Sequence, residues 1–310
     1  MGRIQVLSVN ISEKKGTIKK PVDQIELNEM GVVSDAHAGD WHRQVSLLGK
    51  ESIDKFSAEA KREIAYGEFA ENITTEGILL YECHPLDRFK IGETELEVTQ
   101  IGKKCHGSSC AIFQEVGNCV MPKEGIFARV IKTGTVKPGD EFIYIPRKLT
   151  VMIITLSDRA SKGIYKDKSG PRLNQILTDF LKKEKWPVEI ESMIIPDDEE
   201  QLGKLLDESI KQGIDFVFTT GGTGISQRDI TIDVVKDRLD KEIPGIMELI
   251  RVKYGAVKPN ALLSRSVAGV MKQTLIYTLP GSTRAIDEYM DVIKPTLIHS
   301  LYMLYALDMH

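Results

Sequence analysis

"DFVFTTGGTGISQRDIT" runs from residue 215 to residue 231 and decides the fold of the second half of the chain. Its first part is an apolar run typical of a buried strand, and small residues with three glycines follow at once. Successive glycines let backbone amides approach a phosphate closely, and Asp229 lies just beyond them, where a carboxylate can bind a divalent cation. The stretch predicts a strand that ends in a ligand-binding loop.

Strand and helix patterns alternate on both sides of this stretch. "VMIITL", "VEIESMII" and "TLIYTL" are typical of buried strands. Leu173, Leu177 and Leu181 share one helix face with Ile176 and Phe180. Further helices are expected near residues 202–210, 233–243 and 285–307. This alternation predicts an α/β domain with a doubly wound, mainly parallel sheet over residues 148–310.

The first half has a different pattern. Short β-rich runs are broken by Gly and Pro-Gly turns, and Leu96 and Val98 alternate with polar residues as in a half-buried strand. Only residues 45–60 suggest a helix of any length. We expect a mostly-β domain, a small barrel, over residues 1–147, with the basic stretch at residues 146–148 as the linker. The fold class is therefore an α+β chain of two domains.

Composition agrees with two globular domains and excludes several function classes. The chain has 310 residues, and a prior of about 150 residues per domain gives about two. Lys and Arg number 41 against 45 Asp and Glu, so no basic patch for nucleic acid or an anionic membrane surface is expected. No apolar run reaches the ~20 residues of a membrane span, and no secretory signal is recognisable. We expect a cytoplasmic protein with reduced thiols.

Polar clusters follow the predicted strands of the second half. Ligands bind beyond the carboxyl ends of the strands in open parallel sheets. "LSDRAS", "IIPDD", "TTGGTGISQRD" and "LPGSTRA" all stand at such ends. "GGTG" is neither a dinucleotide fingerprint nor a P-loop, and a glycine-rich turn or a "PDD" helix cap is also common without any ligand. Spacing alone therefore predicts a phosphate or another anionic ligand at these strand ends.

Five motifs of the second half, taken in their order along the chain, indicate a more specific function. "SDRASKGIYKDKSGPRL", "IIPDD", "TTGGTGISQRDIT", "PNALLSRSVAGV" and "LPGSTRA" together resemble the molybdopterin adenylyltransferase family, which includes MogA, MoaB and the G domain of gephyrin. The resemblance implies transfer of AMP from ATP to the terminal phosphate of molybdopterin, with Mg²⁺ bound and pyrophosphate released. Relatives form trimers or hexamers, so it also implies a homo-oligomer.

The resemblance also implies roles for individual residues. Asp197 and Asp229 would be the catalytic pair that holds Mg²⁺. The residues that would bind the pterin and the nucleotide are Ser157, Asp158, Thr220, Gly221, Gly222, Thr223, Gly224, Ser264, Arg265, Ser266, Pro280, Gly281 and Ser282. The chain departs from the family after "LPG", where Thr283 stands at the usual position of a proline and Arg284 follows it.

Simpler roles remain open for some of these residues. Asp198 competes with Asp197 for the metal, because adjacent carboxylates are not separable by sequence. Arg265 is alternatively half of a surface ion pair, and Ser282 is alternatively the cap of the last helix. Some MoaB-type relatives bind without clear turnover, so the alternative to an enzyme is a protein that binds or stores molybdopterin or its molybdenum cofactor.

The first half resembles the MOSC domain family through "DAHAGDWHRQVSLLGKESI", "GEFAENITTEGI", "DRFKIGETELEVTQIGKKCHGSSC" and "MPKEGIFARVIKTGTVKPGD". Such domains are β-barrels that are proposed to carry sulfur on a cysteine or to bind molybdenum cofactor. Cys105 matches the family's cysteine, and Lys103, Lys104 and His106 would favour its thiolate. The resemblance implies that this domain binds, sulfurates or hands on the cofactor, with a molybdoenzyme or a cysteine desulfurase as partner.

Other roles are open for the thiols and for the polar residues of this half. Cys110 is the second choice, and Cys83 and Cys119 are weaker; each is alternatively a small buried hydrophobe, and a zinc site is a further option. His37 and His42 are expected to line a pocket with Arg43 or to be solvated. Asn72, Thr74 and Thr75 either bind anionic oxygens or hold their turn together.

Overall fold

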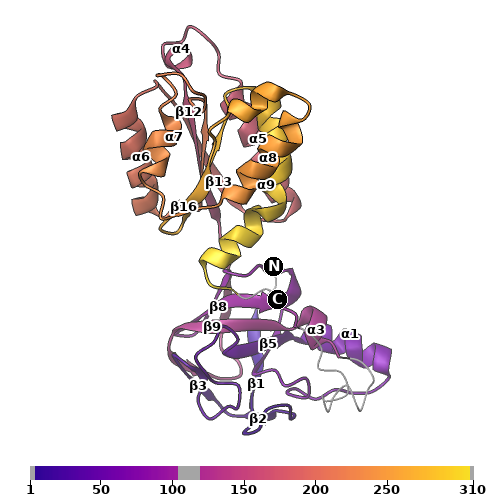
Figure 1. The fold of residues 1–310 in the computed structure, drawn as a ribbon. Helices are drawn as coiled ribbons and strands as arrows, with labels where there is room; N and C mark the ends of the chain where they lie inside the picture. The colour runs from indigo at the N-terminus through magenta and orange to yellow at the C-terminus, as the bar shows by residue number, and fades with distance from the viewer. Residues whose placement is uncertain (1–3, 104–118, 308–310) are drawn as a thin grey trace. The chain divides into compact units, whose positions relative to one another are not determined.

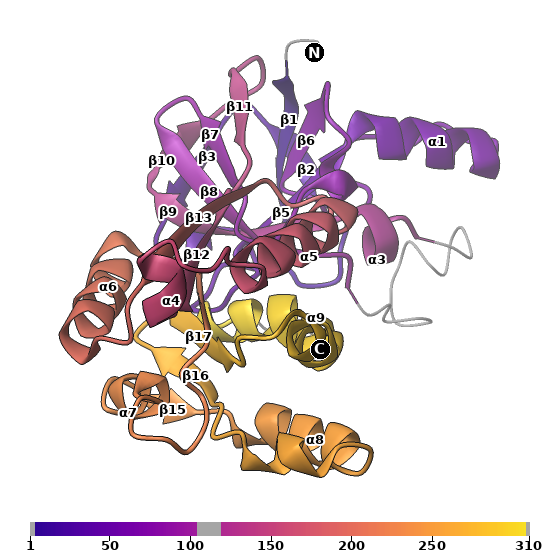
Figure 2. The same ribbon diagram turned by 90° about the horizontal axis from the view of Figure 1, so that it is seen from above.

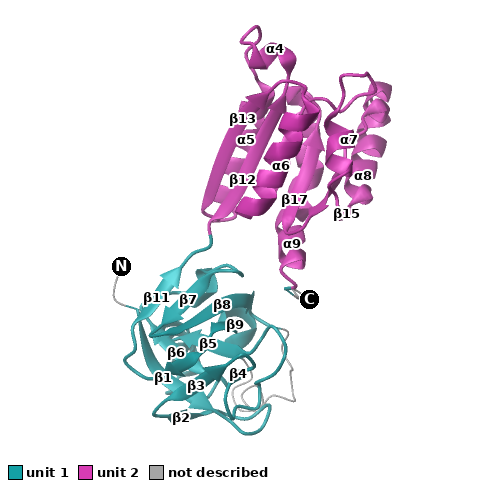
Figure 3. Cartoon of the chain, turned by 90° about the vertical axis from the view of Figure 1, so that its left-hand side faces the viewer, with its two compact units in different colours: residues 1–147, 307–310 teal, residues 148–306 magenta. Residues whose placement is uncertain are grey.

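The structure is a computed structural model of the chain, and it describes residues 4–103 and 119–307. The chain divides into two compact units, shown in different colours in Figure 3. Unit 1 comprises residues 1–147 together with 307–310, and unit 2 comprises residues 148–306. No helix within the described ranges is long and apolar enough to cross a membrane.

Unit 1 is mostly β-structure, as the sequence predicts. One sheet has the strand order β11-β7-β8-β9-β5-β6-β1-β2 and a second has the order β10-β3-β4. The strands are β1 (Gln5–Ile11), β2 (Lys20–Val22), β3 (Ile25–Asn28), β4 (Gly31–Val32), β5 (Val45–Gly49), β6 (Ile73–Glu76), β7 (Arg88–Ile91), β8 (Thr94–Ile101), β9 (Ile126–Lys132), β10 (Gly134–Val136) and β11 (Phe142–Ile145). The short helical elements are α1 (Lys50–Ala60), η1 (Leu80–Glu82) and α3 (Met121–Glu124).

The large sheet of unit 1 curls back toward its own beginning. The amide of Phe142 donates to Ile4 and that of Val6 donates to Asp140, so the segment that leads into β11 joins β1. Aliphatic and aromatic side chains such as Phe89, Leu96 and Phe142 fill the interior of this curled sheet. The result is a barrel-like layer around this core, which agrees with the predicted mostly-β domain, and a second hydrophobic cluster packs α1 and α3 against it.

The helix expected over residues 45–60 is only partly correct. Residues 45–49 form the strand β5, and every one of them is buried. β5 pairs with β6 and β9 at its two edges. Val45 and Leu47 pack into one hydrophobic cluster and Leu48 into another, so both faces of this strand are covered by protein. The helix α1 begins only at Lys50, where polar residues appear at helical spacing.

Unit 2 contains the predicted mainly parallel sheet, with the order β13-β12-β14-β17-β16-β15. β12, β13, β14 and β17 run parallel, whereas β16 pairs antiparallel with both β15 and β17. The strands are β12 (Leu149–Leu156), β13 (Val188–Ile195), β14 (Phe216–Thr220), β15 (Lys241–Glu242), β16 (Ala268–Met271) and β17 (Thr274–Leu279). The fold class predicted for this half is confirmed.

Helices cover both faces of this sheet. In Figures 1 and 2, α6 and α7 lie on one face, and α5, α8 and α9 lie on the other. The helical elements are α4 (Asp158–Ser161), α5 (Ser169–Lys183), α6 (Glu199–Gln212), α7 (Thr231–Lys236), α8 (Pro244–Gly255), η3 (Pro259–Leu263) and α9 (Thr283–Leu304). The helix expected over 233–243 ends at Lys236, and the chain then forms β15.

Glycine conformations provide a test of the packing in unit 1. Gly67 and Gly139 have nearly the same φ, +89° and +86°. A Cβ atom on Gly67 would lie 2.3 Å from the carbonyl oxygen of Lys19, whereas one on Gly139 would have no atom within 4 Å.

We predict that Gly139→Ala lowers the free energy of unfolding of unit 1 by about 1–2 kcal/mol, the cost of a left-handed alanine. Gly67→Ala adds a steric clash and should cost about 2–5 kcal/mol. Urea denaturation in a Trp186→Phe background, followed by the fluorescence of Trp41 in unit 1, measures both. Equal losses in the two variants would contradict the close approach of Gly67 to Lys19.

Candidate functional site

The parallel strands of unit 2 bring the predicted polar segments to one edge of the sheet. Leu156 pairs with Ile195 at the ends of β12 and β13, and Thr220 pairs with Leu279 at the ends of β14 and β17. The four motifs that follow these strands therefore start side by side. The segments after β14 and β17 also touch, since a Cβ on Gly281 would lie 3.5 Å from the Cα of Gly221.

Two carboxylates at this edge are fixed to each other's backbone. The amide of Asp158 donates to Asp197 Oδ2 at 3.3 Å, and the amide of Asp197 donates to Asp158 Oδ1 at 3.3 Å. Burial, followed by the negative charges of Asp158 and Asp229, raises the pKa of Asp197 above its ordinary value. Asp158, Asp197 and Asp229 thus form an acidic site at the sheet edge.

Asp229 is held in a defined orientation beside the glycine loop. Its Oδ2 accepts from the amide of Ser226 at 2.8 Å, and its carboxylate packs over Gly224, where a Cβ would lie 2.8 Å from Oδ2. Although partial burial acts to raise it, hydrogen bonds from Ser226 lower the pKa of Asp229 below its ordinary value. Asp229 is therefore preorganised as an anion.

The geometry separates Asp197 from its neighbour Asp198. Asp198 is the N-cap of α6, and its Oδ1 accepts from the amide of Gln201 at 2.7 Å. Asp197, one residue earlier, faces Asp158 and Asp229. Asp198 thus has the capping role that its "PDD" motif allows, whereas Asp197 is hydrogen-bonded to the backbone of Asp158.

The acidic residues fit a cation that takes most of its ligands from elsewhere. In the described part of the chain, no Lys or Arg forms an ion pair with Asp158, Asp197 or Asp229. Equally, no group of three or more His, Cys, Asp and Glu within that part is arranged to hold a metal ion by itself. Mg²⁺ commonly binds through one or two carboxylates together with water and substrate phosphates. Asp197 and Asp229 match that pattern.

The glycines of the loop are required by close packing. A Cβ on Gly221, whose φ is +97°, would lie 2.4 Å from the carbonyl oxygen of Leu156. One on Gly222, with φ +62°, would lie 2.3 Å from Thr231 Oγ1. Thr231 also donates to the carbonyl of Gly221 at 3.0 Å. The loop is thereby tied both to the end of β12 and to the start of α7.

A cavity of about 320 Å³ opens beside this loop. The amide of Arg265 donates to the carbonyl of Thr223 at 2.9 Å, which attaches the "LSRS" segment to the glycine loop. The predicted ligand residues that line this cavity are Thr223, Gly224, Ser264, Pro280 and Ser282. Ser264 is held there by Tyr289, whose hydroxyl donates to Ser264 Oγ at 2.8 Å.

Other predicted residues have structural contacts instead. Ser157 caps α4 by accepting from the amide of Ala160. Thr220 is fully buried, and its hydroxyl lies 2.9 Å from that of Ser169. Arg265 pairs with Asp233, which is the surface ion pair that the sequence left open.

The structure also places the last two serines that the sequence predicts as ligand residues, Ser266 and Ser282. Ser266 is only 1% exposed, and its hydroxyl lies 2.9 Å from that of Ser264. Ser282 both lines the cavity and caps α9 by accepting from the amide of Ala285. The two roles proposed for Ser282 are therefore compatible with each other.

Sequence reasoning missed much of the cavity wall. The additional polar lining residues are Tyr254, Lys258, Asn260, Glu288 and Tyr289, with Arg284 beside them. They come from the end of α8, from η3 and from α9, segments whose proximity no local pattern indicates. The one available signal was Arg284, which stands where the chain departs from its family.

Unit 1 contains a separate small cavity of about 80 Å³. His37, Trp41, Arg43 and Lys103 contribute to its lining. The guanidinium carbon of Arg43 lies 4.8 Å from the centroid of the Trp41 ring, and the buried Arg43 Nε has no hydrogen-bond partner among the described residues. Neither Arg43 nor Lys103 forms an ion pair within those residues. The cavity is therefore cationic.

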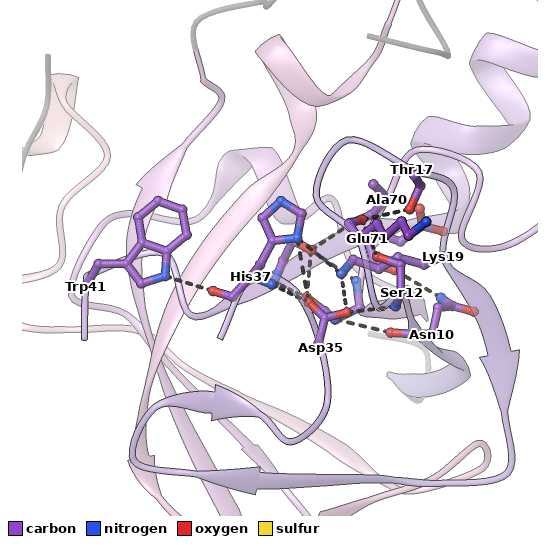
Figure 4. Close-up of polar contacts among 12 residues, drawn as sticks. Asn10, Ser12, Thr17, Lys19, Asp35, His37, Trp41, Ala70 and Glu71 are labelled. Atoms are coloured by element: carbon purple, nitrogen blue, oxygen red, sulfur yellow. Dashed lines mark hydrogen bonds and ion pairs between the residues drawn. The ribbon is translucent and has the colours of Figure 1, made fainter. Parts of the chain in front are cut away.

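A buried charged network supports His37 (Figure 4). Asp35 accepts from the buried ammonium of Lys19 and, at 3.0 Å each, from the amides of Ser12 and His37. His37 Nδ1 lies 3.4 Å from Lys19 Nζ and 3.6 Å from Asp35 Oδ1. Although burial acts to raise it, hydrogen bonds from His37 and Lys19 keep the pKa of Asp35 well below its ordinary value.

Among the other polar residues predicted in this unit, His42, Asn72 and Thr74 contact other residues of the protein, whereas the buried hydroxyl of Thr75 has no hydrogen-bond partner among the described residues. His42 lies 3.2 Å from Gln100 Oε1 and does not line the cavity. Asn72 is fully buried, with its carboxamide bonded to Ser46 and to the carbonyl of Asn10. Thr74 is also buried and donates to Glu71. Asn72 thus ties the segment before β6 to β5 and β1, whereas Thr74 and Thr75 lie within β6, so the turn expected here is a strand.

The structure describes only some of the cysteines that the sequence singles out. Cys105 and Cys110, the first and second choices for a reactive thiol, lie outside the described residues. Cys83 is only 5% exposed, and burial raises its pKa to about 12. Cys83 is thus a buried hydrophobe, as its alternative role proposed.

With this geometry established, comparisons with known proteins identify both halves. The probable molybdopterin binding domain matches residues 152–299, and the MOSC domain matches residues 34–143. The chain is 37% identical to a molybdopterin adenylyltransferase of Escherichia coli over 162 residues, which are 50% of this chain and 80% of that protein. It is 36% identical to gephyrin of Dictyostelium discoideum over 157 residues, 49% of this chain but 22% of gephyrin.

The chain is also similar to solved structures. A tungsten cofactor synthesizing protein, MoaB from Pyrococcus furiosus, is 36% identical, with 51% of this chain and 98% of that chain covered and a TM-score of 0.45. Unit 2 has the class of fold in which ligands bind at the carboxyl ends of parallel strands. The chain belongs to the MogA/MoaB family of molybdopterin-binding proteins through its second half, and it carries a MOSC domain in its first half.

The buried network of unit 1 generates a pH prediction. Glu71 is fully buried, and burial raises its pKa from 4.5 to about 7. Between these values the folded state binds more protons than the unfolded state. The stability that Glu71 contributes is therefore fully present below pH 4.5 and is lost as the pH rises toward about 7.

We predict that Glu71→Gln makes the free energy of unfolding of unit 1 fall less between pH 5 and pH 8 than in the parent protein. Urea denaturation at several pH values, followed through Trp41 in a Trp186→Phe background, measures the difference. Identical pH dependence in the two proteins would show that Glu71 is ionised in the folded state across this range.

Proposed function

We propose that this protein acts in molybdenum cofactor biosynthesis and that unit 2 adenylylates molybdopterin with ATP and Mg²⁺. The observation that carries the proposal is the convergence of Asp158, Asp197 and Asp229 with the glycine loop at one sheet edge. The identity of 37% to a molybdopterin adenylyltransferase supports it. In the reaction, the terminal phosphate of molybdopterin forms a bond to the α-phosphorus of ATP, and pyrophosphate leaves.

The chain's own residues supply positioning and charge. Asp197 and Asp229 would hold Mg²⁺, which when bound neutralises phosphate charge and orients the reacting groups. The amide of Gly221 already donates to the carbonyl of Leu279, so the amides of residues 222–224 would be the loop's donors to phosphate oxygens. Ser264 and Ser282 would orient the pterin in the cavity of about 320 Å³. Catalysis of phosphoryl and nucleotidyl transfer rests mainly on such positioning.

Adjacent aspartates provide a matched test of the catalytic assignment. We predict that Asp197→Asn lowers the rate of adenylylation at least about a hundredfold, because a ligand of the cation is lost. Asp198→Asn should retain activity, since asparagine also caps helices well. The measurement is Mg²⁺-dependent pyrophosphate release with molybdopterin and ATP, with the adenylated pterin verified by mass spectrometry.

The same assay decides between an enzyme and a storage protein. A wild-type protein that binds molybdopterin but releases no pyrophosphate would overturn the enzymatic proposal in favour of binding or storage. Activity that survives Asp197→Asn but not Asp198→Asn would reassign the cation to the neighbouring carboxylate.

For unit 1 we propose binding of an anionic ligand, with transfer of sulfur or of the cofactor through Cys105. The support is the small cationic cavity, in which Arg43 Nε lacks a partner among the described residues. His37 is held there by Asp35 and Lys19, so a donor or acceptor of fixed orientation faces the ligand. A partner that supplies sulfur or receives the cofactor, such as a cysteine desulfurase or a molybdoenzyme, follows from this role.

The cavity of unit 1 can be probed with molybdate. We predict that molybdate changes the fluorescence of Trp41 in a Trp186→Phe background and that Arg43→Gln weakens its affinity about tenfold, the effect of one charged hydrogen bond. Arg88→Gln serves as the control, because Arg88 on β7 pairs with Glu97 on β8 and does not line the cavity. Equal weakening by both substitutions would exclude a specific role for Arg43.

A further inference from the structure

One wall of the cavity in unit 2 carries a carboxylate held between two cations. Arg284 Nε lies 3.0 Å from Glu288 Oε1, one helical turn along α9. Lys258, which precedes η3, places its ammonium 3.8 Å from the same oxygen. All three side chains line the cavity. A single carboxylate oxygen therefore attracts two cations from different elements.

This arrangement leaves most of the cations' binding capacity unused. Arg284 and Lys258 form no second ion pair within residues 4–103 and 119–307. A guanidinium offers five N–H donors and an ammonium offers three, but Glu288 accepts one hydrogen bond from Arg284 and approaches Lys258 only to 3.8 Å. The side chain of Arg284 is 67% exposed and that of Glu288 is 19% exposed. The carboxylate is thus the more buried member of the pair, and the guanidinium is the more solvent-exposed one.

The other residues that line this cavity are uncharged. Thr223, Gly224, Ser264 and Ser282 supply neutral donors, and the only charged side chains among the residues that line this cavity are Lys258, Arg284 and Glu288. The formal charges of these three side chains add up to one positive charge. Any electrostatic attraction of an anion to the cavity wall must therefore come from Arg284 and Lys258, against the opposing charge of Glu288.

We propose that Arg284 and Lys258 form a phosphate clamp in this cavity and that Glu288 occupies the clamp until a ligand phosphate displaces it. The inference rests on the proposed function in that the ligand is a phosphorylated pterin. A dianionic phosphate accepts from both cations at once, whereas the carboxylate is bound to α9 and offers one oxygen. In the free protein, Glu288 thus holds the side chains of Arg284 and Lys258 near each other. It also lowers the affinity of these two cations for weaker anions.

The role of Glu288 in phosphate binding can be tested against that of its neighbour Asp287. Asp287 precedes Glu288 on α9 and pairs with Arg172 of α5 at 2.7 Å, outside the cavity. Glu288→Gln and Asp287→Asn change the net charge equally. We expect Glu288→Gln to tighten the binding of inorganic phosphate about threefold to fivefold, as the loss of an exposed ion pair allows, while Asp287→Asn leaves it unchanged. Arg284→Gln should weaken it by a similar factor.

The measurement is an NMR titration of the full chain with inorganic phosphate at constant ionic strength, read at the backbone amide of Gly224, which lines the cavity. Equal affinities in wild type and Glu288→Gln, or equal tightening by Asp287→Asn, would overturn the clamp. A merely structural ion pair would alter the melting temperature of Glu288→Gln without altering its affinity for phosphate.

The failure of the clamp and the failure of the proposed function have different signatures. If the wild type adenylylates molybdopterin but Glu288→Gln binds phosphate no more tightly, only the clamp is wrong. If phosphate binding responds as expected but no adenylylation occurs, the clamp stands in a protein that binds its ligand without turnover.

Discussion

Four parallel strands end at one edge of the sheet in unit 2, and every functional assignment there depends on that constraint. Because β12, β13, β14 and β17 run in the same direction, the segments that follow them start together although they are far apart in the chain. Asp158 and Asp197 meet through reciprocal backbone hydrogen bonds only because Leu156 and Ile195 are in register. The glycines of residues 221–224 allow the third segment to pack against them.

Sequence patterns predicted the parts of this site that depend on local structure. The buried strand at residues 216–220, the glycine loop and Asp229 are contiguous, so their proximity required no tertiary information. The choice between Asp197 and Asp198 could not be made from sequence, because it depends on which carboxylate caps α6. Residues 45–49 were assigned to a helix because a fully buried strand and a buried helix segment share the same apolar run.

The cavity wall was beyond the reach of sequence because its members meet only in three dimensions. Lys258, Arg284 and Glu288 belong to segments on either side of β16 and β17, and no periodicity connects the first of them with the other two. In unit 1, sequence reasoning named His37 and Arg43 as pocket residues, and both line the cationic cavity, but it missed Lys19 and Asp35, which contact His37. Lys19 gave no signal, since an isolated lysine in a polar stretch is ordinarily solvated.

The central claim is that Asp197 and Asp229 share one divalent cation beside the glycine loop. Anomalous diffraction from crystals grown with Mn²⁺ and a non-hydrolysable ATP analogue tests it most directly, because the scattering identifies the metal independently of any activity. The account predicts a manganese peak in contact with both carboxylates and with nucleotide phosphate oxygens. A metal bound through Asp198, or nucleotide phosphates remote from residues 221–224, would contradict it.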